Sequence, residues 1–350
     1  MAERREIVNK YVQQGLPTAV ALPAANLSRS TYYYKPHPGK RGKTRSTYTL
    51  TGDGELVCNT KIVQRMDQIL SRPFIDYGCD RMTLVLKKEG YLINRKKVYR
   101  LMKEAHLLYP KRLRNAGKSK EYVKYTIPTP EGPYEIVELD IKYIHITGEG
   151  RTGYLVTVFD TFHREALTWH LDYQMKAIQI KGLLEKLVKG KKINLIKIRT
   201  DNGPQFISTL LRESLEGMGI EHEFIRPGTP EQNGHIESFH SLVEKRVVNH
   251  YMFLSLKKAR EVFSQFYDVY NNERIMKVLL GLAPTEFLRE WEQGKIGVSD
   301  GANRRRYFFR EKPGQSHGYS REDFLIGNSN QIQNQLSSTT QTDLVQLIGG

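Results

Sequence analysis

EIVELDIKYIHI, at residues 135–146, is the stretch that decides the fold of this chain. Apolar and polar side chains alternate along its middle, and this period of two predicts a β-strand. Asp140 is unexpected there, because aspartate is disfavoured within strands. It lies on the face opposite Leu139, Ile141 and Tyr143. We therefore interpret Asp140 as a functional residue of the strand.

Strand and helix patterns alternate in the residues that follow. Further strands are predicted at 154–162, 165–171, 194–200 and 220–227. Helices are predicted at 174–190, 206–219 and 235–253. The order β-β-β-α-β-α-β-α resembles the ribonuclease-H-like fold, an α/β fold in which flanking helices cover a mixed five-stranded sheet.

Two further carboxylates occupy positions that such a sheet would bring to Asp140. Asp201 ends the fourth strand, and Glu237 lies in the first turns of the helix that follows Gly234. The first and fourth strands of this fold are neighbours, so the two aspartates should converge while the helix brings in Glu237. Singly, Asp201 could simply start a turn and Glu237 could favour a helix N-terminus. Their joint spacing, with 60 residues between the aspartates and 35 between Asp201 and Glu237, favours one shared site.

Clustered carboxylates repel one another unless a cation neutralises them. Ligands that are all oxygen select hard cations such as Mg²⁺, for which Mn²⁺ can substitute. Two such ions, about 3.5–4 Å apart, activate the attacking oxygen and stabilise the leaving oxygen of a phosphodiester. The residues expected to shape this site are Asn202, Gly203, Asn233, Gly234 and His240.

The net charge of +16 lies entirely in the front of the chain. Residues 1–130 hold 26 Lys and Arg against 10 Asp and Glu, whereas the remaining 220 residues hold 28 of each. A basic front joined to a neutral rear predicts that the front meets a polyanion, although a merely soluble basic surface stays an alternative. The sequence shows no membrane-length apolar run and no secretory signal. Its two cysteines form no CxxC pair, which fits a reducing cytoplasm.

The basic front contains a predicted helix-turn-helix. A helix at 79–89 ends at Gly90, and a second one follows Asn94 as N-cap. In such a motif the later helix enters the major groove of DNA. A solvated basic face on an ordinary helical hairpin is the alternative. The side chains predicted to contact DNA are Arg29, in a short helix capped by Ser28, and Arg95, Lys96, Lys97, Arg100, Lys103, Lys245 and Arg246.

Three blocks, ELDIKYI, RTDNGPQF and RPGTPEQNGHIESFH, resemble the DDE-type core shared by retroviral integrases and many insertion-sequence transposases. DYGCDRMTLVLKKEGYLINRKKVYRLMKEAHLL, with LSRSTYYYK upstream, resembles the OrfB-type proteins of the IS-three group. The resemblance covers about residues 20–290. It implies that Asp140, Asp201 and Glu237 are the catalytic metal ligands of an enzyme that cuts element ends and joins the freed 3′-hydroxyl to new DNA.

The same resemblance implies double-stranded DNA partners, namely terminal inverted repeats and target DNA, a homo-oligomer on DNA, and an upstream OrfA-type partner. It also implies a bacterial, cytoplasmic, nucleoid-associated protein. Three features depart from the family pattern: Glu244 replaces a basic residue, Ile275 and Met276 replace Pro and His, and the polar tail has no counterpart. These departures leave a catalytically weakened DNA-binding protein or repressor as one alternative, and a nuclease acting on RNA–DNA hybrids or junctions as another.

The predicted organisation has seven parts. They are an N-terminal helical DNA-binding segment at 1–35, a basic linker at 36–54, a helix-turn-helix DNA-binding domain at 55–115, a connector at 116–133, a ribonuclease-H-like integrase catalytic core at 134–250, a C-terminal helical extension at 251–293, and a basic, then polar, flexible tail at 294–350.

Overall fold

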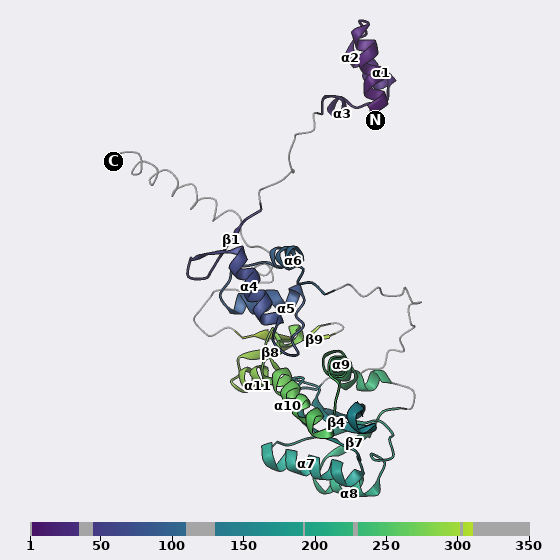
Figure 1. The fold of residues 1–350 in the computed structure, drawn as a ribbon, viewed down its shortest axis with the longest axis vertical. Helices are drawn as coiled ribbons and strands as arrows, with labels where there is room; N and C mark the ends of the chain where they lie inside the picture. The colour runs from purple at the N-terminus through teal and green to yellow at the C-terminus, as the bar shows by residue number, and fades with distance from the viewer. Residues whose placement is uncertain are drawn as a thin grey trace, which may run out of the picture. The chain divides into compact units, whose positions relative to one another are not determined.

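The computed structural model of the protein contains two compact units, residues 1–47 and 48–350 (Figure 1). It describes residues 2–34, 45–109, 130–191, 193–226, 230–301 and 304–310.

The first unit is a small helical assembly. Its helices are α1 (Ala2–Gln13), α2 (Thr18–Ala24) and α3 (Arg29–Tyr33), and its buried core consists of Val8, Ala21, Leu22 and Leu27. Gly15 has a φ of +98°, which suits the turn that ends α1. The Ser28 hydroxyl accepts a hydrogen bond from the Thr31 N–H at 3.2 Å, so the predicted N-cap of α3 is confirmed.

The helix-turn-helix forms where the sequence predicts it. Its helices are α4 (Asn59–Leu70), α5 (Cys79–Lys88) and α6 (Arg95–Glu104). Gly90 has a φ of +90° and turns the chain after α5, and the Asn94 side chain accepts from the Lys97 N–H at 2.9 Å to cap α6. Ile62, Met66, Met82, Leu86 and Met102 fill the core between the three helices.

The prediction of a linker over residues 36–54 is wrong for the last part of that range. Strands β1 (Tyr48–Leu50) and β2 (Leu56–Cys58) form an antiparallel hairpin in front of α4. Thr49 is buried and donates to the Asn59 side-chain oxygen, and the Leu92 N–H donates to the Leu50 carbonyl. Polar, threonine-rich residues therefore form a strand because tertiary contacts pair their backbone. Residues 36–44 of this linker and most of the connector at 116–133 lie outside the described residues.

The second unit also holds the predicted mixed five-stranded sheet, with strand order β5-β4-β3-β6-β7. Strand β3 (Ile136–Ile146) pairs antiparallel with β4 (Arg151–Asp160), and β4 pairs antiparallel with β5 (Ala166–Asp172). On its other edge β3 pairs parallel with β6 (Lys197–Thr200), which pairs parallel with β7 (Glu221–Phe224). This is the ribonuclease-H-like arrangement expected from the sequence.

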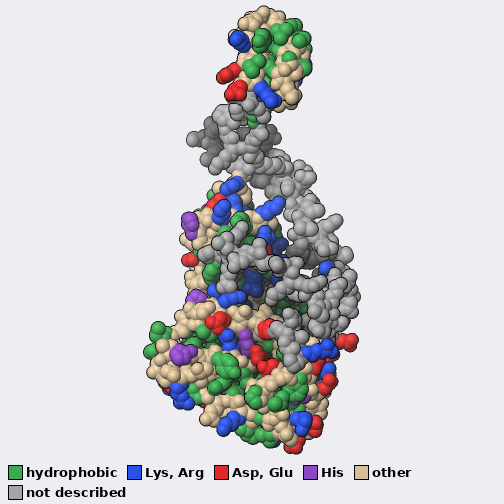
Figure 2. Space-filling view, turned by 90° about the vertical axis from the view of Figure 1, so that its right-hand side faces the viewer, with side chains coloured by type: hydrophobic (Ala, Val, Ile, Leu, Met, Phe, Trp, Pro, Cys, Tyr) green, Lys and Arg blue, Asp and Glu red, His purple; other side chains and the backbone are tan. Residues whose placement is uncertain are grey.

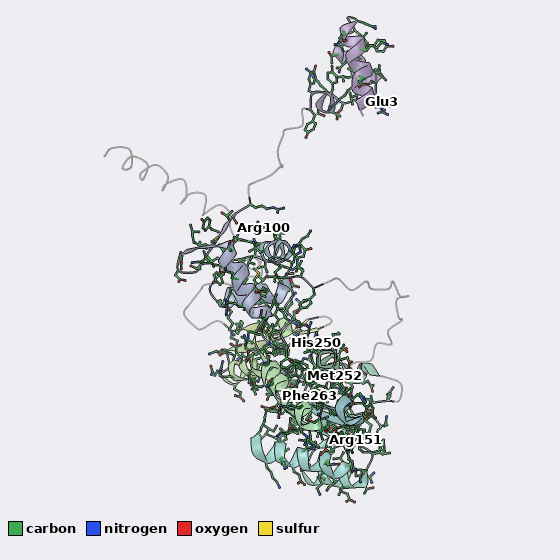
Figure 3. All side chains as sticks on the ribbon, in the orientation of Figure 1. Glu3, Arg100, Arg151, His250, Met252 and Phe263 are labelled. Carbon is green, nitrogen blue, oxygen red and sulfur yellow. The ribbon has the colours of Figure 1, made fainter. Side chains whose placement is uncertain are left out.

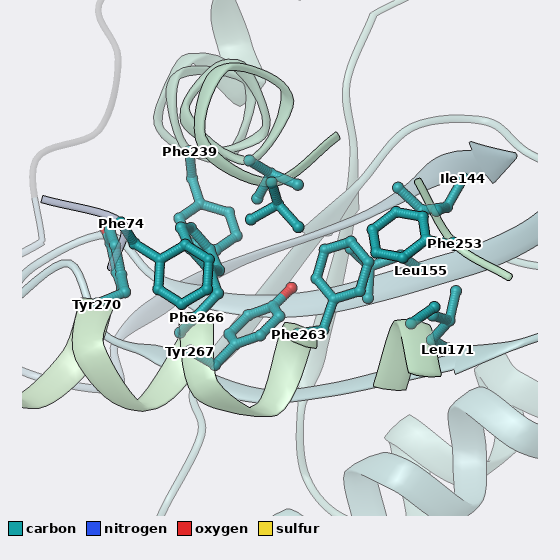
Figure 4. Packing of buried hydrophobic residues seen from close by; sticks show 14 of the residues in the cluster. Phe74, Ile144, Leu155, Leu171, Phe239, Phe253, Phe263, Phe266, Tyr267 and Tyr270 are labelled. Atoms are coloured by element: carbon teal, nitrogen blue, oxygen red, sulfur yellow. The ribbon is translucent and has the colours of Figure 1, made fainter. Parts of the chain in front are cut away.

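Helices cover both faces of this sheet. Val137 and Leu139 of β3 point to the face packed by α7 (Ala177–Lys191) and α8 (Thr209–Gly217). The opposite face packs against α9 (Gly234–Val243) and α10 (Leu256–Asn272). Figure 4 shows aromatic side chains of α10, among them Phe263, Phe266 and Tyr267, pointing from that helix toward the sheet and α9.

The long helix predicted at 235–253 is shorter and irregular. After α9 the chain continues as a π-helical turn, η3 (Glu244–Val248), in which the Asn249 N–H bonds the Glu244 carbonyl five residues back. A π turn contains one residue more than an α-helix of the same path. It therefore rotates the side chains that follow relative to the expected periodicity.

The C-terminal extension is confirmed as helical, and part of the predicted tail is ordered. After η4 (Lys277–Leu279) and α11 (Pro284–Glu292), β8 (Ile296–Gly301) and β9 (Arg304–Phe309) form an antiparallel hairpin. The Tyr307 ring packs against Phe162 and Phe287, and this contact anchors the hairpin to the sheet domain. Residues 311–350 lie outside the described residues.

None of the helices in the described parts of the chain combines the length and the apolar character needed to cross a membrane.

A buried charged cluster closes the β4–β5 hairpin. His163 is fully buried, with Nδ1 2.8 Å from Asp160 Oδ1 and Nε2 2.9 Å from Glu165 Oε2. Burial alone would lower the pKa of this imidazole, but the two carboxylates outweigh it and raise the pKa from 6.5 to about 9. The folded protein therefore holds the imidazolium proton more tightly than the unfolded chain does.

We expect the stability due to His163 to be complete below about pH 6.5 and to be lost as the pH rises through about 9. In that window the free energy of unfolding should fall by roughly 1.4 kcal/mol per pH unit because of this residue. Urea denaturation at several pH values measures the slope. His163→Gln should flatten it, whereas His170→Gln, at a partly exposed histidine, should not. Equal slopes in wild type and His163→Gln would contradict the assignment.

Candidate active site

The buried carboxylate of Glu138 ties α9 to the sheet. Glu138 is fully buried on β3, where Oε2 accepts from the Ile236 N–H at 2.7 Å and Oε1 lies 2.9 Å from His235 Nδ1. Arg199 of β6, also buried, lies 3.9 Å from the same carboxylate and donates to the Gln232 carbonyl just before α9. An anion at the N-terminus of a helix suits the helix dipole. The start of α9 is therefore held by charges on two neighbouring strands.

The next two residues on the same face of β3 continue this contact. His240 Nδ1 lies 3.2 Å from Asp140 Oδ2, and Lys142 Nζ lies 2.9 Å from Glu244 Oε2. Two strand residues advance about 6.6 Å and four helical residues about 6 Å, so strand and helix run in step. Each turn of α9 thus meets one side chain of β3.

Asp201 follows the end of β6, on the strand next to Asp140. Glu138 pairs with Arg199 in the parallel register, and Asp140 and Asp201 each follow that pair by two residues along the chain. Asp201 Oδ1 accepts from the Gly203 N–H at 3.0 Å, and the Asn202 side chain donates to the Ile225 carbonyl at 2.9 Å. Both aspartates are half-buried. The TDNG turn is therefore built to hold Asp201 at this edge of the sheet.

Glu237 lies on α9 between the two contacts that hold the helix to β3. Its side chain is exposed, one residue after Ile236 and three before His240. Within the described ranges, the structure has no group of three or more His, Cys, Asp and Glu side chains arranged to hold a metal ion. The structure thus puts Asp140 on β3, Asp201 directly after the neighbouring β6, and Glu237 on α9, which runs beside β3.

Two buried polar atoms at this site have no hydrogen-bond partner among the described residues. They are Asn233 Oδ1, at the N-cap of α9, and His240 Nε2. Asn233 and His240 are 3% and 8% exposed, so bulk water does not satisfy either atom. Within the described residues these atoms and the carboxylates of Asp140 and Asp201 are not gathered into one metal site, although carboxylate and amide oxygens are the kind of ligand that a hard cation prefers.

Glu244 has an ion-pair partner on the sheet. Its carboxylate pairs with Lys142, which follows Asp140 by two residues on the same face of β3. The two charges neutralise each other and link the end of α9 to β3.

The predicted DNA-contacting side chains differ in how free they are. Lys96, Lys103 and Lys245 are exposed, and Arg100 lies on α6 (Figure 3) within 3.9 Å of Glu104. Lys97 instead donates to the Tyr48 carbonyl, and Arg95 pairs with Asp80. Figure 2 shows Lys and Arg side chains on the part of the surface that carries α4–α6.

Two other predicted contacts have partners within the protein. The Arg29 guanidinium lies 5.9 Å from the Tyr33 ring centroid. Arg246 Nη2 bonds Asp76 Oδ2 at 2.6 Å, and its side chain is only 18% exposed. Its role in DNA binding stays a prediction.

Glu138 and Arg199 are site residues that the sequence interpretation missed. A glutamate in an alternating strand resembles any residue on a solvated face, and Arg199 precedes the TDNG turn without a motif of its own. The available signal was that Glu138 and Asp140, two residues apart, share one face of the same strand.

Comparison with known proteins supports the same division of the chain. An integrase core domain model matches residues 130–230, a second integrase core domain model matches 218–284, and an HTH-like domain model matches 59–115. The two core models span the sheet, α9 and α10, and the third spans α4 to α6.

Several relatives come from bacterial insertion elements. An IS476 protein of Xanthomonas euvesicatoria is 27% identical over 81% of this chain and 76% of its own length. The transposase InsK of element IS150 from Escherichia coli, named as putative, is 25% identical over 79% of this chain and 95% of its own. An IS407 protein of Burkholderia multivorans is 29% identical over 60% of this chain and 75% of its own.

Among solved structures, the HTLV-2 integrase catalytic core domain in complex with magnesium covers 45% of this chain and 97% of its own. It is 18% identical to the chain, with a TM-score of 0.35.

Replacing the buried Glu138 carboxylate should loosen the start of α9. In Glu138→Gln the neutral amide cannot satisfy the Ile236 N–H, His235 and Arg199 together, so we expect a loss of about 1–3 kcal/mol in the free energy of unfolding. Chemical denaturation measures this loss. The control is Glu221→Gln, at an exposed carboxylate 3.0 Å from Lys197, which should change stability by less than about 0.5 kcal/mol. Equal losses in the two variants would show that Glu138 has no special role.

Proposed function

Since the chain belongs to the integrase-core proteins and carries an HTH-like domain in front of that core, we propose that it is a DNA transposase. In this proposal it binds insertion-sequence ends and catalyses Mg²⁺-dependent strand cleavage and strand transfer. The supporting observation is the parallel pairing of β3 with β6, whose last pair, Glu138 with Arg199, precedes Asp140 and Asp201 by two residues on each segment, while α9 carries Glu237.

Asp140, Asp201 and Glu237 are proposed to hold two Mg²⁺ ions, with Mn²⁺ as a substitute. Bound there, such ions would polarise the attacking oxygen and the leaving oxygen of a phosphodiester. His240 supports this role because its Nδ1 contacts Asp140 and can fix the orientation of that carboxylate. Asn202 and Gly203 do the same for Asp201, through the turn that they form.

Substrate binding falls to the basic helices. Lys96, Arg100 and Lys103 recur at helical spacing on α6, so they can follow one DNA backbone while the helix enters the major groove. Cleavage at an element end would free a 3′-hydroxyl, whose oxygen then attacks a target phosphodiester and displaces a 3′-hydroxyl from it. We propose that the protein acts as a homo-oligomer on DNA in the bacterial cytoplasm, with an OrfA-type partner.

The catalytic assignment predicts that Asp201→Asn abolishes Mg²⁺-dependent cleavage and joining of DNA that carries the element's ends. Loss of one metal-binding carboxylate should lower the rate by at least about 10³-fold, since charge stabilisation of the transition state is lost. Binding of the ends should persist, as a gel-shift assay can verify.

The matched control is Asp268→Asn, the same change at an exposed carboxylate of α10, which should retain activity. If the wild type binds the ends but never cleaves them in Mg²⁺ or Mn²⁺, the protein is a DNA-binding derivative of a transposase. If it prefers RNA–DNA hybrids, it is a nuclease of the same fold.

DNA binding through α6 predicts a defined salt dependence. Each lost phosphate contact should reduce the slope of log affinity against log salt by about 0.9. The double variant Lys96→Gln, Lys103→Gln should therefore lower the slope by nearly 2, as fluorescence anisotropy on duplex DNA can measure. Lys97→Gln is the control in the same helix, because Lys97 is bonded to the Tyr48 carbonyl. A slope unchanged in the double variant would remove α6 from the interface.

A further inference from the structure

The turn at residues 72–77, between α4 and α5, contacts the catalytic core, and we call it the docking turn. Its carboxylate, Asp76, is 15% exposed and bonds two guanidiniums. Arg246 Nη2 lies 2.6 Å from Oδ2, and Arg274 Nη2 contacts Oδ1. A third guanidinium, that of Arg81, lies 3.7 Å from Oδ1. One acidic side chain thus contacts guanidiniums from three separate segments, and its single charge leaves the cluster with a net positive charge.

The backbone of the docking turn is shaped to reach into the core. Phe74 has a φ of +63°, an uncommon conformation for a residue with a side chain, and its carbonyl accepts from Arg274 Nη1 at 3.0 Å. Its ring is 8% exposed and lies 5.5 Å from the Phe266 ring and 5.8 Å from the Tyr251 ring. Figure 4 shows Phe74 beside Phe266 and Tyr270 of α10. An aromatic side chain of the helix-turn-helix domain is therefore part of the core under the catalytic sheet.

Tyr77 extends the contact to the segment after α10. Its hydroxyl donates to the Glu273 carbonyl at 3.2 Å and accepts from the Ile275 N–H at 3.0 Å. The Ile275 side chain is buried among the apolar residues of α4–α6. Isoleucine at this position thus has a packing role between the two domains.

A second row of contacts runs along α5. Lys88 Nζ lies 2.5 Å from Glu286 of α11. Leu84 lies over Gly281, where an added Cβ would come within 3.4 Å of Leu84 Cδ1, and the φ of +83° at Gly281 also suits glycine. These contacts and the docking turn lie at opposite ends of the same helix. Because they are well separated, they resist rotation of α5 as well as its displacement.

Arg246 connects these contacts to the helix that carries Glu237. It lies in η3, which continues α9 directly, and α9 carries Glu237. Ile75 and Tyr77, on either side of Asp76, are buried in the same apolar cluster as Val98 and Leu101 of α6. The helix proposed to read DNA and the helix proposed to hold a metal ligand are thus joined through one ion-paired carboxylate.

We propose that Asp76 is a positioning residue that fixes the helix-turn-helix domain to the end of α9. DNA bound by α6 would then reach the Asp140–Asp201–Glu237 site at a set distance, and this distance would select the phosphodiester that is cut. The inference rests on the proposed transposase function for its second part only, since the docking itself is independent of catalysis.

The docking is tested by hydrogen–deuterium exchange on the full chain. Asp76→Asn should raise exchange by about tenfold in residues 72–78 and 244–276, because guanidiniums from both segments lose their counter-charge. Exchange in α7 should stay unchanged, and Asp76→Glu should restore much of the protection. Asp67→Asn, at an exposed carboxylate of α4, is the matched control. Wild-type exchange in Asp76→Asn, or a rise that includes α7, would overturn the proposal.

The positioning is tested by mapping cuts on end DNA that is labelled at one terminus. Asp76→Asn should bind this DNA within about threefold of wild type, because α6 is untouched. Cleavage at the wild-type phosphodiester should fall by about tenfold and spread to neighbouring positions, so kcat changes and KM does not. A single wild-type cut at the wild-type rate would overturn the positioning role. A wild type inactive on every DNA would instead refute the transposase function, and the exchange experiment would still decide the docking.

Discussion

The rest of the site depends on one buried charge, the carboxylate of Glu138. A fully buried anion is tolerated only when it is paired and hydrogen-bonded, and here His235, Arg199 and the Ile236 N–H meet that need. Those partners belong to β6 and to the start of α9. Pairing of this charge therefore fixes the rotation of α9 about its own axis relative to β3. The contacts of His240 with Asp140 and of Glu244 with Lys142 follow from that rotation. Glu237 lies on the exposed side of this helix, between Ile236 and His240.

Segments with a clear hydrophobic period could be predicted from the sequence, whereas the short strands of the two hairpins could not. The five strands of the sheet and helices α4 to α10 follow from alternation, helical spacing and caps such as Asn94. The hairpins β1–β2 and β8–β9 resemble linker and tail in composition, because threonine, glycine and arginine dominate them. Only tertiary partners make them strands, as when Tyr307 packs on Phe162 and Phe287. No local pattern carries that information.

The candidate site also contains features that could be predicted from the sequence and features that could not. Strand order predicted that the strands leading to Asp140 and Asp201 are neighbours, and β3 does pair with β6. Arg246 was predicted to contact DNA, and that role stays a prediction. Its guanidinium, in the π turn, bonds Asp76. The buried pair of Glu138 and Arg199 could not be recognised, since a charge satisfied inside a protein and a charge solvated outside it have the same sequence signature.

In an ordinary helix, length and rotation about the helix axis change together. The π turn at residues 244–248 removes this coupling. Each residue of an α-helix adds about 1.5 Å and about 100° of rotation. One surplus residue therefore lets everything after it turn while everything before it keeps its place. Insertion or loss of one residue here would change where the Arg246 side chain points and how Phe253 packs in the core under the sheet. Glu237 and His240, which precede the turn, would stay in place. A change of one residue at this turn would therefore alter how the segments before and after it pack against each other, without moving the proposed metal ligand on α9.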